Sequence, residues 1–215
     1  MAFKQVSSPH SHARQRTGQI MQLVLLATLP GLLVLSYQFG WGLLINILIA
    51  TISAISAEAL ILKLRNRPIE FYLRDYSAVV TAVLLGLALP PLAPWWLVVV
   101  ATVFSIVIAK QLYGGLGSNP FNPAMVGYVV ALISFPIEMT TWVTPVSLLA
   151  ADVSHPGLLE SLAIVFAGNS PVDGVTGATP LDLFKHSDGL LVEQIYQNNS
   201  LFSAASFAGV GWEWA

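Results

Sequence analysis

The residues best suited to chemistry lie in one short polar stretch, Asp173–Asp182, which reads DGVTGATPLD. It offers two threonine hydroxyls, at Thr176 and Thr179, and a carboxylate at each end. Two glycines and an alanine lie between these groups, and small residues let a bulky ligand or another macromolecule approach the backbone. We therefore predict that a bulky ligand or another macromolecule must reach Thr179.

The end of the same stretch also has the pattern of a helix start. Thr179 would be the N-cap, Pro180 would take the first helical position, and Asp182 follows as an acid three residues on. Capping alone explains these last residues, but it leaves DGVTGA without a role.

The rest of the chain is far more apolar than a soluble domain. Hydrophobic residues make up 55% of the sequence and charged residues 9%, with a mean hydropathy of +0.73. We therefore predict an all-α integral membrane protein. The absence of cysteine from the sequence excludes disulfides, thiolate metal sites and cysteine nucleophiles within the chain.

Apolar runs predict about five membrane-spanning helices, since roughly 20 residues cross the hydrocarbon core. The fifth run is short for a span, and the third ends in a pair of prolines. The predicted spans are Ile20–Phe39, Trp41–Leu64, Ser77–Leu92, Trp95–Tyr113 and Ala124–Pro136.

Basic residues predict the orientation of these spans. Lysine and arginine gather in the N-terminal tail, in the loop Lys63–Arg74, and at Lys110, which places those segments in the cytoplasm. Residues 1–19 are then a cytoplasmic tail, residues 20–136 a transmembrane bundle, and residues 137–215 a periplasmic region. Within that region we expect short helices around Gly157–Phe166 and Leu191–Gln197. The chain ends at GWEWA, so we expect it to stop before a further span.

Several motifs, in order, resemble one known family. They are SPHSH, AEALILKLR, SAVVTAVLLGLALPPLAPWW, IAKQLYGGLGSNPFNPAMVGY and DGVTGATPLDLFK, and the similarity runs from about Ser8 to Trp214. The sequence resembles the RnfD/NqrB family, the membrane subunits of Rnf-type and sodium-pumping electron-transport complexes. Members have about ten spans, so this chain would be a shortened form.

The resemblance implies a flavoprotein. DGVTGAT is similar to the motif in which a flavin transferase esterifies the final threonine with the phosphate of FMN. The acceptor would be Thr179, and the attachment motif would be formed by Asp173, Gly174, Thr176, Gly177 and Ala178. A phosphate on an N-cap hydroxyl would meet free N–H groups at a helix start, so capping and attachment are compatible.

The family further implies electron transfer that couples ferredoxin and NAD chemistry to ion translocation across the bacterial inner membrane. Expected partners are the other subunits of the complex, the flavin transferase and membrane lipid, with no nucleic acid. A second flavin, a noncovalent riboflavin, is a further expectation by analogy. We assign no catalytic residue and no metal ligand to this chain.

Two other features admit two interpretations each, and a third is assigned no chemistry. The segment Gly114–Ala124 fails the context of a phosphate loop and is interpreted as a broken helix, in which Asn119 and Asn122 either form a turn or contact an ion. Glu58, the one carboxylate inside a predicted span, either pairs near Lys63 at the cytoplasmic edge or serves cation passage. The His-x-His of the tail, at residues 10 and 12, is assigned no chemistry.

Two rival functions stay open from the sequence. Glu58 and the interrupted helix would suit a non-redox transporter or channel subunit, and a shortened chain would suit a structural scaffold. A flavin that survives denaturation would separate the redox interpretation from both rivals.

Overall fold

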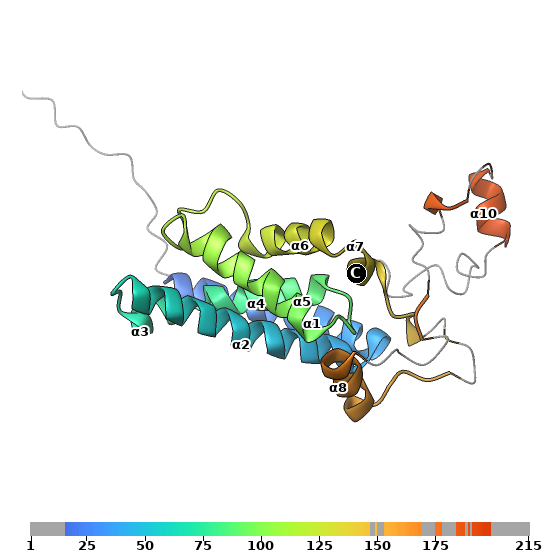
Figure 1. The fold of residues 1–215 in the computed structure, drawn as a ribbon, viewed down its shortest axis with the longest axis horizontal. Coiled ribbons are helices and arrows are strands. Elements are labelled where there is room, and N and C mark those ends of the chain that lie inside the picture. The colour runs from blue at the N-terminus through green and yellow to red at the C-terminus, as the bar shows by residue number, and fades with distance from the viewer. Residues whose placement is uncertain are drawn as a thin grey trace, which may run out of the picture.

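The protein is an elongated bundle of helices with several short helices at one end (Figure 1). The computed structural model describes residues 16–146, 149, 153–168, 175–177, 184–187, 189 and 191–198. Within this part of the chain, β-structure is limited to one isolated bridge between Val143 and Thr176. The predicted all-α class is therefore confirmed.

Helices form at all five predicted positions. Two of them, α1 and α2, are long and apolar enough to cross a membrane by themselves, and the other three are shorter. The fourth continues from an α-helix into a π-helix without a break. The bundle helices are α1 (Thr17–Phe39), α2 (Trp41–Leu64), α4 (Ser77–Ala88), α5 (Trp95–Val103) with η1 (Phe104–Gln111), and α6 (Pro123–Ser134).

The chain runs back and forth, so the connections gather at two ends. At one end lie the start of α1, the short helix α3 (Ile69–Leu73) and the loop after η1; we call this the basic end, after Arg65, Arg67 and Arg74 (Figure 1). At the other end, the loop end, lie α7 (Pro136–Thr140) and α8 (Leu158–Ala167). Helix α10 (Val192–Asn198) lies beyond them. Both short helices expected in this region, α8 and α10, are confirmed.

Small side chains bring α2 and α4 into the closest association in the bundle. Ala50 and Ala54 of α2 and Ala78 and Ala82 of α4 are all buried in one apolar core, which also includes Leu85. Packing of small residues lets helix backbones approach closely where no water drives association. This pair forms the centre against which α5 and α6 pack.

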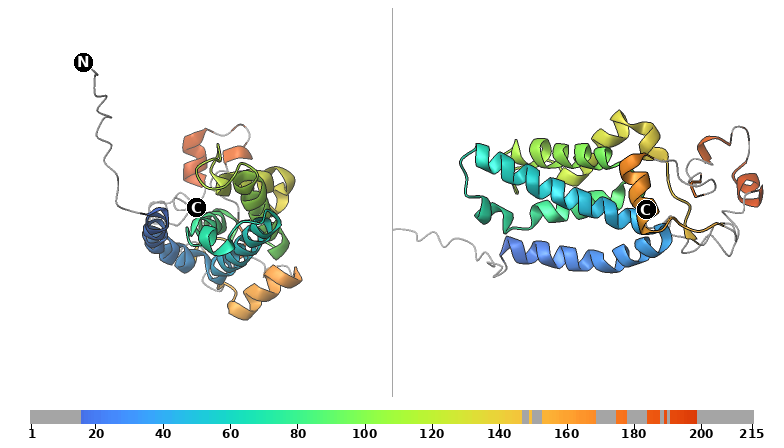
Figure 2. Two further views of the ribbon diagram at one scale, coloured as in Figure 1. Left: turned by 90° about the vertical axis from the view of Figure 1, so that its left-hand side faces the viewer. Right: turned by 60° about the horizontal axis from the view of Figure 1, so that its bottom comes forward.

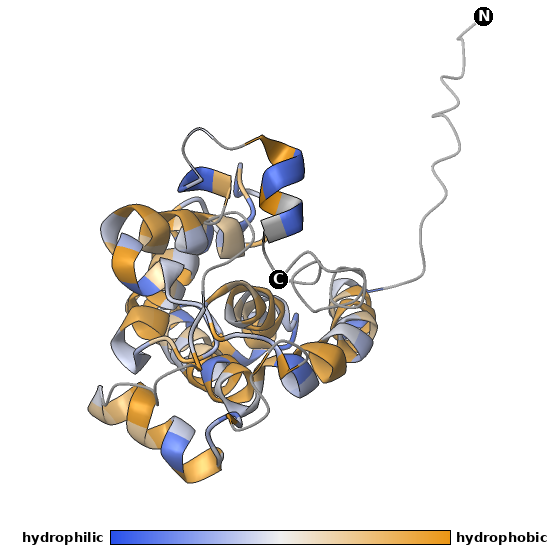
Figure 3. Ribbon diagram, turned by 90° about the vertical axis from the view of Figure 1, so that its right-hand side faces the viewer, coloured by the Kyte–Doolittle hydropathy of each residue, from blue (hydrophilic) through white to orange (hydrophobic). Residues whose placement is uncertain are grey.

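Helix α1 lies at the edge of the bundle, as two views show (Figure 2). In the most apolar 18-residue stretch of this helix, only 6% of the residues are buried. Leu26 and Leu33 are among its exposed side chains. Most residues of the bundle helices are apolar (Figure 3). A helix that is apolar on every side suits a surrounding of lipid or of other apolar helices.

Candidate functional site

The structure describes part of the predicted attachment motif. Thr176 and Gly177 are described, together with the preceding Val175. Asp173, Gly174, Ala178 and the predicted acceptor Thr179 lie outside the described residues. The assignment of Thr179 therefore stays a prediction, and what the structure adds is the setting of the residues before it.

A backbone bridge holds these residues to the segment that follows α7. Thr176 faces Val143 in an antiparallel bridge, the Thr144 N–H donates to the Val175 carbonyl at 2.8 Å, and the Gly177 N–H donates to the Trp142 carbonyl at 3.2 Å. A Cβ on Gly177 would lie 2.5 Å from the Thr144 hydroxyl oxygen. A larger residue at this position would therefore require the Thr144 side chain to move.

The bridge is docked on the helices through apolar side chains. Val143 and Val175 are 1% exposed and form a buried cluster with Leu35, Phe39 and Leu43, at the junction of α1 and α2. The Trp142 ring adds an edge-to-face contact with Phe39, with centroids 6.2 Å apart. These contacts fix residues 175–177, two positions before the predicted acceptor, at the loop end of the bundle.

A pocket of about 460 Å³ opens beside this bridge. Thr176 lines it together with Pro94 before α5, Glu138 and Thr141 of the α7 segment, and Ile164 of α8. Pockets of this size, with mostly apolar walls and few polar groups, accommodate organic ligands. The pocket and the described part of the motif are thus immediate neighbours.

A histidine at the same end lies against the turn between α1 and α2. A Cβ on Gly40, which has φ of +77°, would lie 3.4 Å from Nδ1 of His155. Both ring nitrogens of His155 are buried without a hydrogen-bond partner among the described residues. Burial disfavours the charged ring and lowers the pKa of His155 below its usual value of 6.5.

A second polar site lies inside the bundle near the basic end. Glu58 of α2 and Lys110 of η1 are each 1% exposed, and Nζ of Lys110 donates to Oε1 of Glu58 at 2.5 Å. Nε2 of Gln111 donates to the same oxygen at 2.7 Å. Nζ of Lys110 also donates to Oγ of Ser77 at 2.6 Å.

This site corrects two expectations. Glu58 does not pair at the edge with Lys63, which is exposed, because Glu58 faces the bundle interior, where Lys110 meets it. Lys110, which the sequence suggested as a marker of the cytoplasmic surface, is buried in that pair. The sequence could have indicated this pair, because it places opposite charges on two apolar spans. Charges within spans usually face the interior of the bundle and pair there.

The glycine-rich segment forms a loop, so the predicted broken helix is wrong. Gly114, Gly115 and Gly117 have positive φ, and Asn119 stabilises the turn by accepting from the Gly117 N–H and donating to the Phe121 carbonyl. The side chain of Asn122 caps α6 by accepting from the Ala124 N–H at 3.0 Å. These bonds support the structural interpretation of both asparagines.

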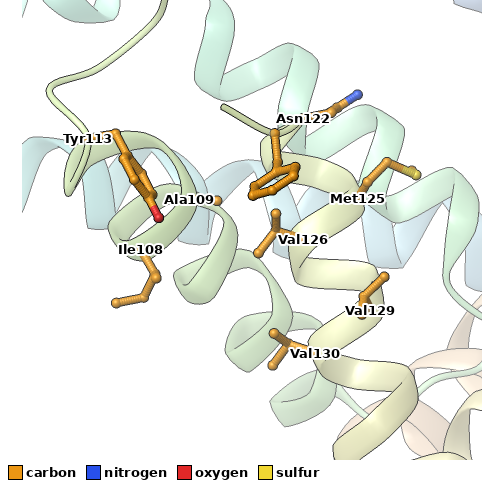
Figure 4. A pocket seen from close by; sticks show the side chains of 9 residues that line it. Ile108, Ala109, Tyr113, Asn122, Met125, Val126, Val129 and Val130 are labelled. Carbon is orange, nitrogen blue, oxygen red and sulfur yellow. The ribbon is translucent and has the colours of Figure 1, made fainter. Parts of the chain in front are cut away.

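The helix irregularity lies just before this loop, in the π-helix η1. Beside it, an apolar pocket of about 590 Å³ is lined by residues of both η1 and α6, which otherwise pack against each other (Figure 4). Ile108 and Tyr113 line one side, and Met125, Val126 and Val129 line the other (Figure 4). Its walls offer few polar groups, which suits acyl chains or apolar side chains.

The arrangement defines an all-α membrane bundle with a docked polar loop at one end and a buried ion pair near the other. A model of the NQR2, RnfD, RnfE family matches residues 4–215. The chain therefore belongs to this family, as the sequence motifs indicated.

Three relatives carry names that make them subunits of an ion-translocating oxidoreductase complex. The protein of Alcanivorax borkumensis is 57% identical over 97% of this chain and 59% of its own length. Those of Cellvibrio japonicus and Escherichia fergusonii are 49% and 52% identical over 100% of this chain, and over 60% and 63% of their own lengths. The chain thus spans about three fifths of the length of these relatives.

The Gly177 contact predicts how the bridge responds to substitution. In Gly177→Ala, the added Cβ would meet the Thr144 hydroxyl and separate the two segments. We expect the amide protons of Thr144 and Gly177 to exchange faster, by about tenfold for each 1.4 kcal/mol lost. Hydrogen–deuterium exchange with mass spectrometry measures this. Thr144→Ala in the same chain removes the obstructing oxygen and should restore protection, and unchanged exchange in the single variant would contradict the packing.

The lowered pKa of His155 predicts a pH dependence of stability. The unfolded state binds a proton at His155 more readily than the folded state, so the free energy of unfolding falls as pH drops below about 6.5 and levels off below the folded pKa. We expect the thermal midpoint in detergent to fall between about pH 8 and about pH 5.5. His155→Gln should reduce that fall, and an equal fall in the variant would assign the effect to other groups.

Proposed function

We propose that this chain is the membrane subunit of an Rnf-type electron-transport complex and carries FMN on Thr179 through a phosphoester. Within that complex it accepts and passes electrons, and the redox chemistry between ferredoxin and NAD is coupled to ion translocation across the membrane. The observation that carries this proposal is the seven-residue attachment motif, in a chain whose family membership extends over residues 4–215. The names of the relatives support the coupling of redox chemistry to ion movement.

The described residues near the motif fit a bound flavin. The pocket beside Thr176 has apolar walls from Pro94 and Ile164 that suit a flat aromatic ring, and Thr141 and Glu138 supply polar groups. The missing Cβ of Gly177 keeps the backbone of the motif close to Thr144. These residues would hold the ring against the bundle and shield it from water.

The flavin, when bound, supplies reversible one- and two-electron chemistry, while the protein supplies position and electrostatics. The bridge at Val143 and Thr176 and the cluster around Phe39 would keep the cofactor at a fixed distance from the apolar bundle. A fixed position matters because electron transfer between subunits needs a defined separation. We include a noncovalent riboflavin within the complex as a further part of this proposal.

The proposed location is the bacterial inner membrane. Residues 1–19 would lie in the cytoplasm, residues 20–136 in the membrane, and residues 137–215 in the periplasm. The clustering of Arg65, Arg67 and Arg74 at one end of the bundle supports this orientation. The flavin transferase would then meet the motif outside the cytoplasm.

Substitution of the two threonines distinguishes attachment from capping. In chains co-expressed with the flavin transferase, we expect intact mass to show FMN less one water, lost in Thr179→Ala and retained in Thr176→Ala. Thr179→Ser keeps a hydroxyl and should retain part of the adduct, and Asp173→Ala should reduce it if that carboxylate presents the loop.

Capping alone gives a different result in the same experiment. Thr179→Ala would then cost about 1 kcal/mol of helix stability, with no flavin to lose. A wild-type mass without the adduct, or an adduct retained in Thr179→Ala, contradicts the assignment. Fluorescence of the chain on a denaturing gel is the matching test against the transporter and scaffold alternatives, because a noncovalent flavin dissociates there.

The orientation has its own test. We expect an alkaline phosphatase fused near residues 187–190 to be active in cells, because that enzyme requires export. A fusion in the loop Lys63–Arg74 is the internal control and should be inactive, since positive loops stay in the cytoplasm. The reverse pattern would overturn the proposed orientation and leave the fold unaffected.

A further inference from the structure

Two opposite charges are buried in the bundle, where most of the buried side chains are apolar. Glu58 lies about two turns from the basic end of α2, and Lys110 lies near the end of η1. Removing charges from water is costly even when they pair, so buried ion pairs are poor stabilisers. Ionisable groups within membrane spans more often mark routes for ions or protons.

The pair is the inner part of a longer chain of hydrogen bonds. Nζ of Lys110 donates to Oγ of Ser77 at 2.6 Å, and Oγ of Ser77 donates to Oδ1 of Asp75 at 2.5 Å. Asp75 is partly exposed and lines a polar pocket of about 630 Å³ at the basic end, together with Gln19. Consecutive short hydrogen bonds therefore connect this surface pocket with the buried carboxylate.

The inner end of this chain has an acceptor without a donor. Oε1 of Glu58 accepts from Lys110 and Gln111, whereas Oε2 is buried and has no hydrogen-bond partner among the described residues. An unsatisfied charged oxygen in such a place is costly, and a proton on the carboxylate, received at Oε1 from Lys110, would remove the charge. The arrangement thus provides both a route and a terminal acceptor.

We propose that Asp75, Ser77 and Lys110 relay protons between the pocket at the basic end and the Glu58 carboxylate, which serves as a proton-loading site. The inference rests on the proposed function, because loading has a purpose in a complex that moves ions. It specifies the proton as the ion handled at this site.

Each step of the relay balances. The Lys110 ammonium gives a proton to the Glu58 carboxylate, which leaves an amine and a carboxylic acid. The amine takes a proton from the Ser77 hydroxyl, and that oxygen takes one from a protonated Asp75. The net change is the transfer of one proton from Asp75 to Glu58, with Lys110 again an ammonium and Ser77 again a hydroxyl.

The groups around the site favour a proton over a metal cation. Lys110 occupies the position between Glu58 and Ser77, and its positive charge repels another cation at short range. Gln111 offers Nε2 to Glu58, and its backbone carbonyl accepts from the Arg65 guanidinium at 2.8 Å, which adds a second positive charge nearby. A sodium ion would instead need several oxygen ligands around an open space.

The first test separates a relay from a structural ion pair. Glu58→Leu with Lys110→Met replaces the pair by apolar side chains, a change that is often neutral or stabilising for a buried pair. In inverted membrane vesicles containing the whole complex, we expect flavin content and electron transfer to be retained. Proton uptake per electron should be lost, because the variant has no carboxylate to load and no ammonium to relay the proton. Proton uptake at the wild-type ratio would overturn the relay.

The second test interrupts the relay and leaves the ion pair intact. Ser77→Ala removes the connecting hydroxyl, and Ser77→Thr keeps it. Thr81→Ala is the matched control, because it removes a buried hydroxyl one turn further along α4. Among the described residues, that hydroxyl bonds only to the Ser77 carbonyl, so it is not part of the relay. We expect proton uptake per electron to fall in Ser77→Ala and to be preserved in the other two variants.

Outcomes of these tests distinguish the relay from the proposed function. Equal proton uptake in Ser77→Ala and Thr81→Ala would reject the relay. Sodium uptake without proton uptake by the wild-type complex would also reject it, while leaving the electron-transport function in place. A wild-type complex without flavin or electron transfer would reject the proposed function itself.

Discussion

Hydrocarbon cannot form hydrogen bonds, and this constraint governs both polar sites of the bundle. Every charged or polar group on an inward face must find its partner within the protein. Oε1 of Glu58 meets this requirement with donors from η1, and Lys110 meets it with acceptors from α2 and α4. The ion pair and the bond from Lys110 to Ser77 therefore link three helices, beside an α2–α4 contact formed by alanines.

The loop end satisfies the same constraint by a different means. There the chain leaves the apolar bundle, and the backbone of residues 142–144 and 175–177 finds partners in a short bridge. Val143 and Val175 then insert into the cluster at the α1–α2 junction, which ties the motif to the bundle. A cofactor attached near this bridge would be held by the membrane helices themselves, a useful property where electrons must pass between subunits.

The two sites lie at opposite ends of the bundle, which suits the proposed coupling of redox chemistry to ion movement. The described residues between them are mainly apolar helices, with α2 and α4 as the shared elements. Movement of α2 or α4 would affect the ion pair directly, because Glu58 and Ser77 belong to them. The relatives are longer than this chain, which matches 59% to 63% of their lengths.

The sequence by itself determined the class of the protein, the five helices, the two short helices at the loop end and the family. These features depend on local composition and on motifs read within a few residues, and hydropathy predicts spans because lipid imposes one length scale. The sequence also predicts Thr179 as the acceptor of FMN. Thr179 lies outside the described residues, so this assignment stays a prediction. Only the tertiary structure decided that Lys110 and Glu58, 52 residues apart, are partners and that Thr176 pairs with Val143. The register of each helix sets which side chains face one another. The π-helical winding at Phe104–Gln111 changes that register, and apolar composition alone does not predict such winding.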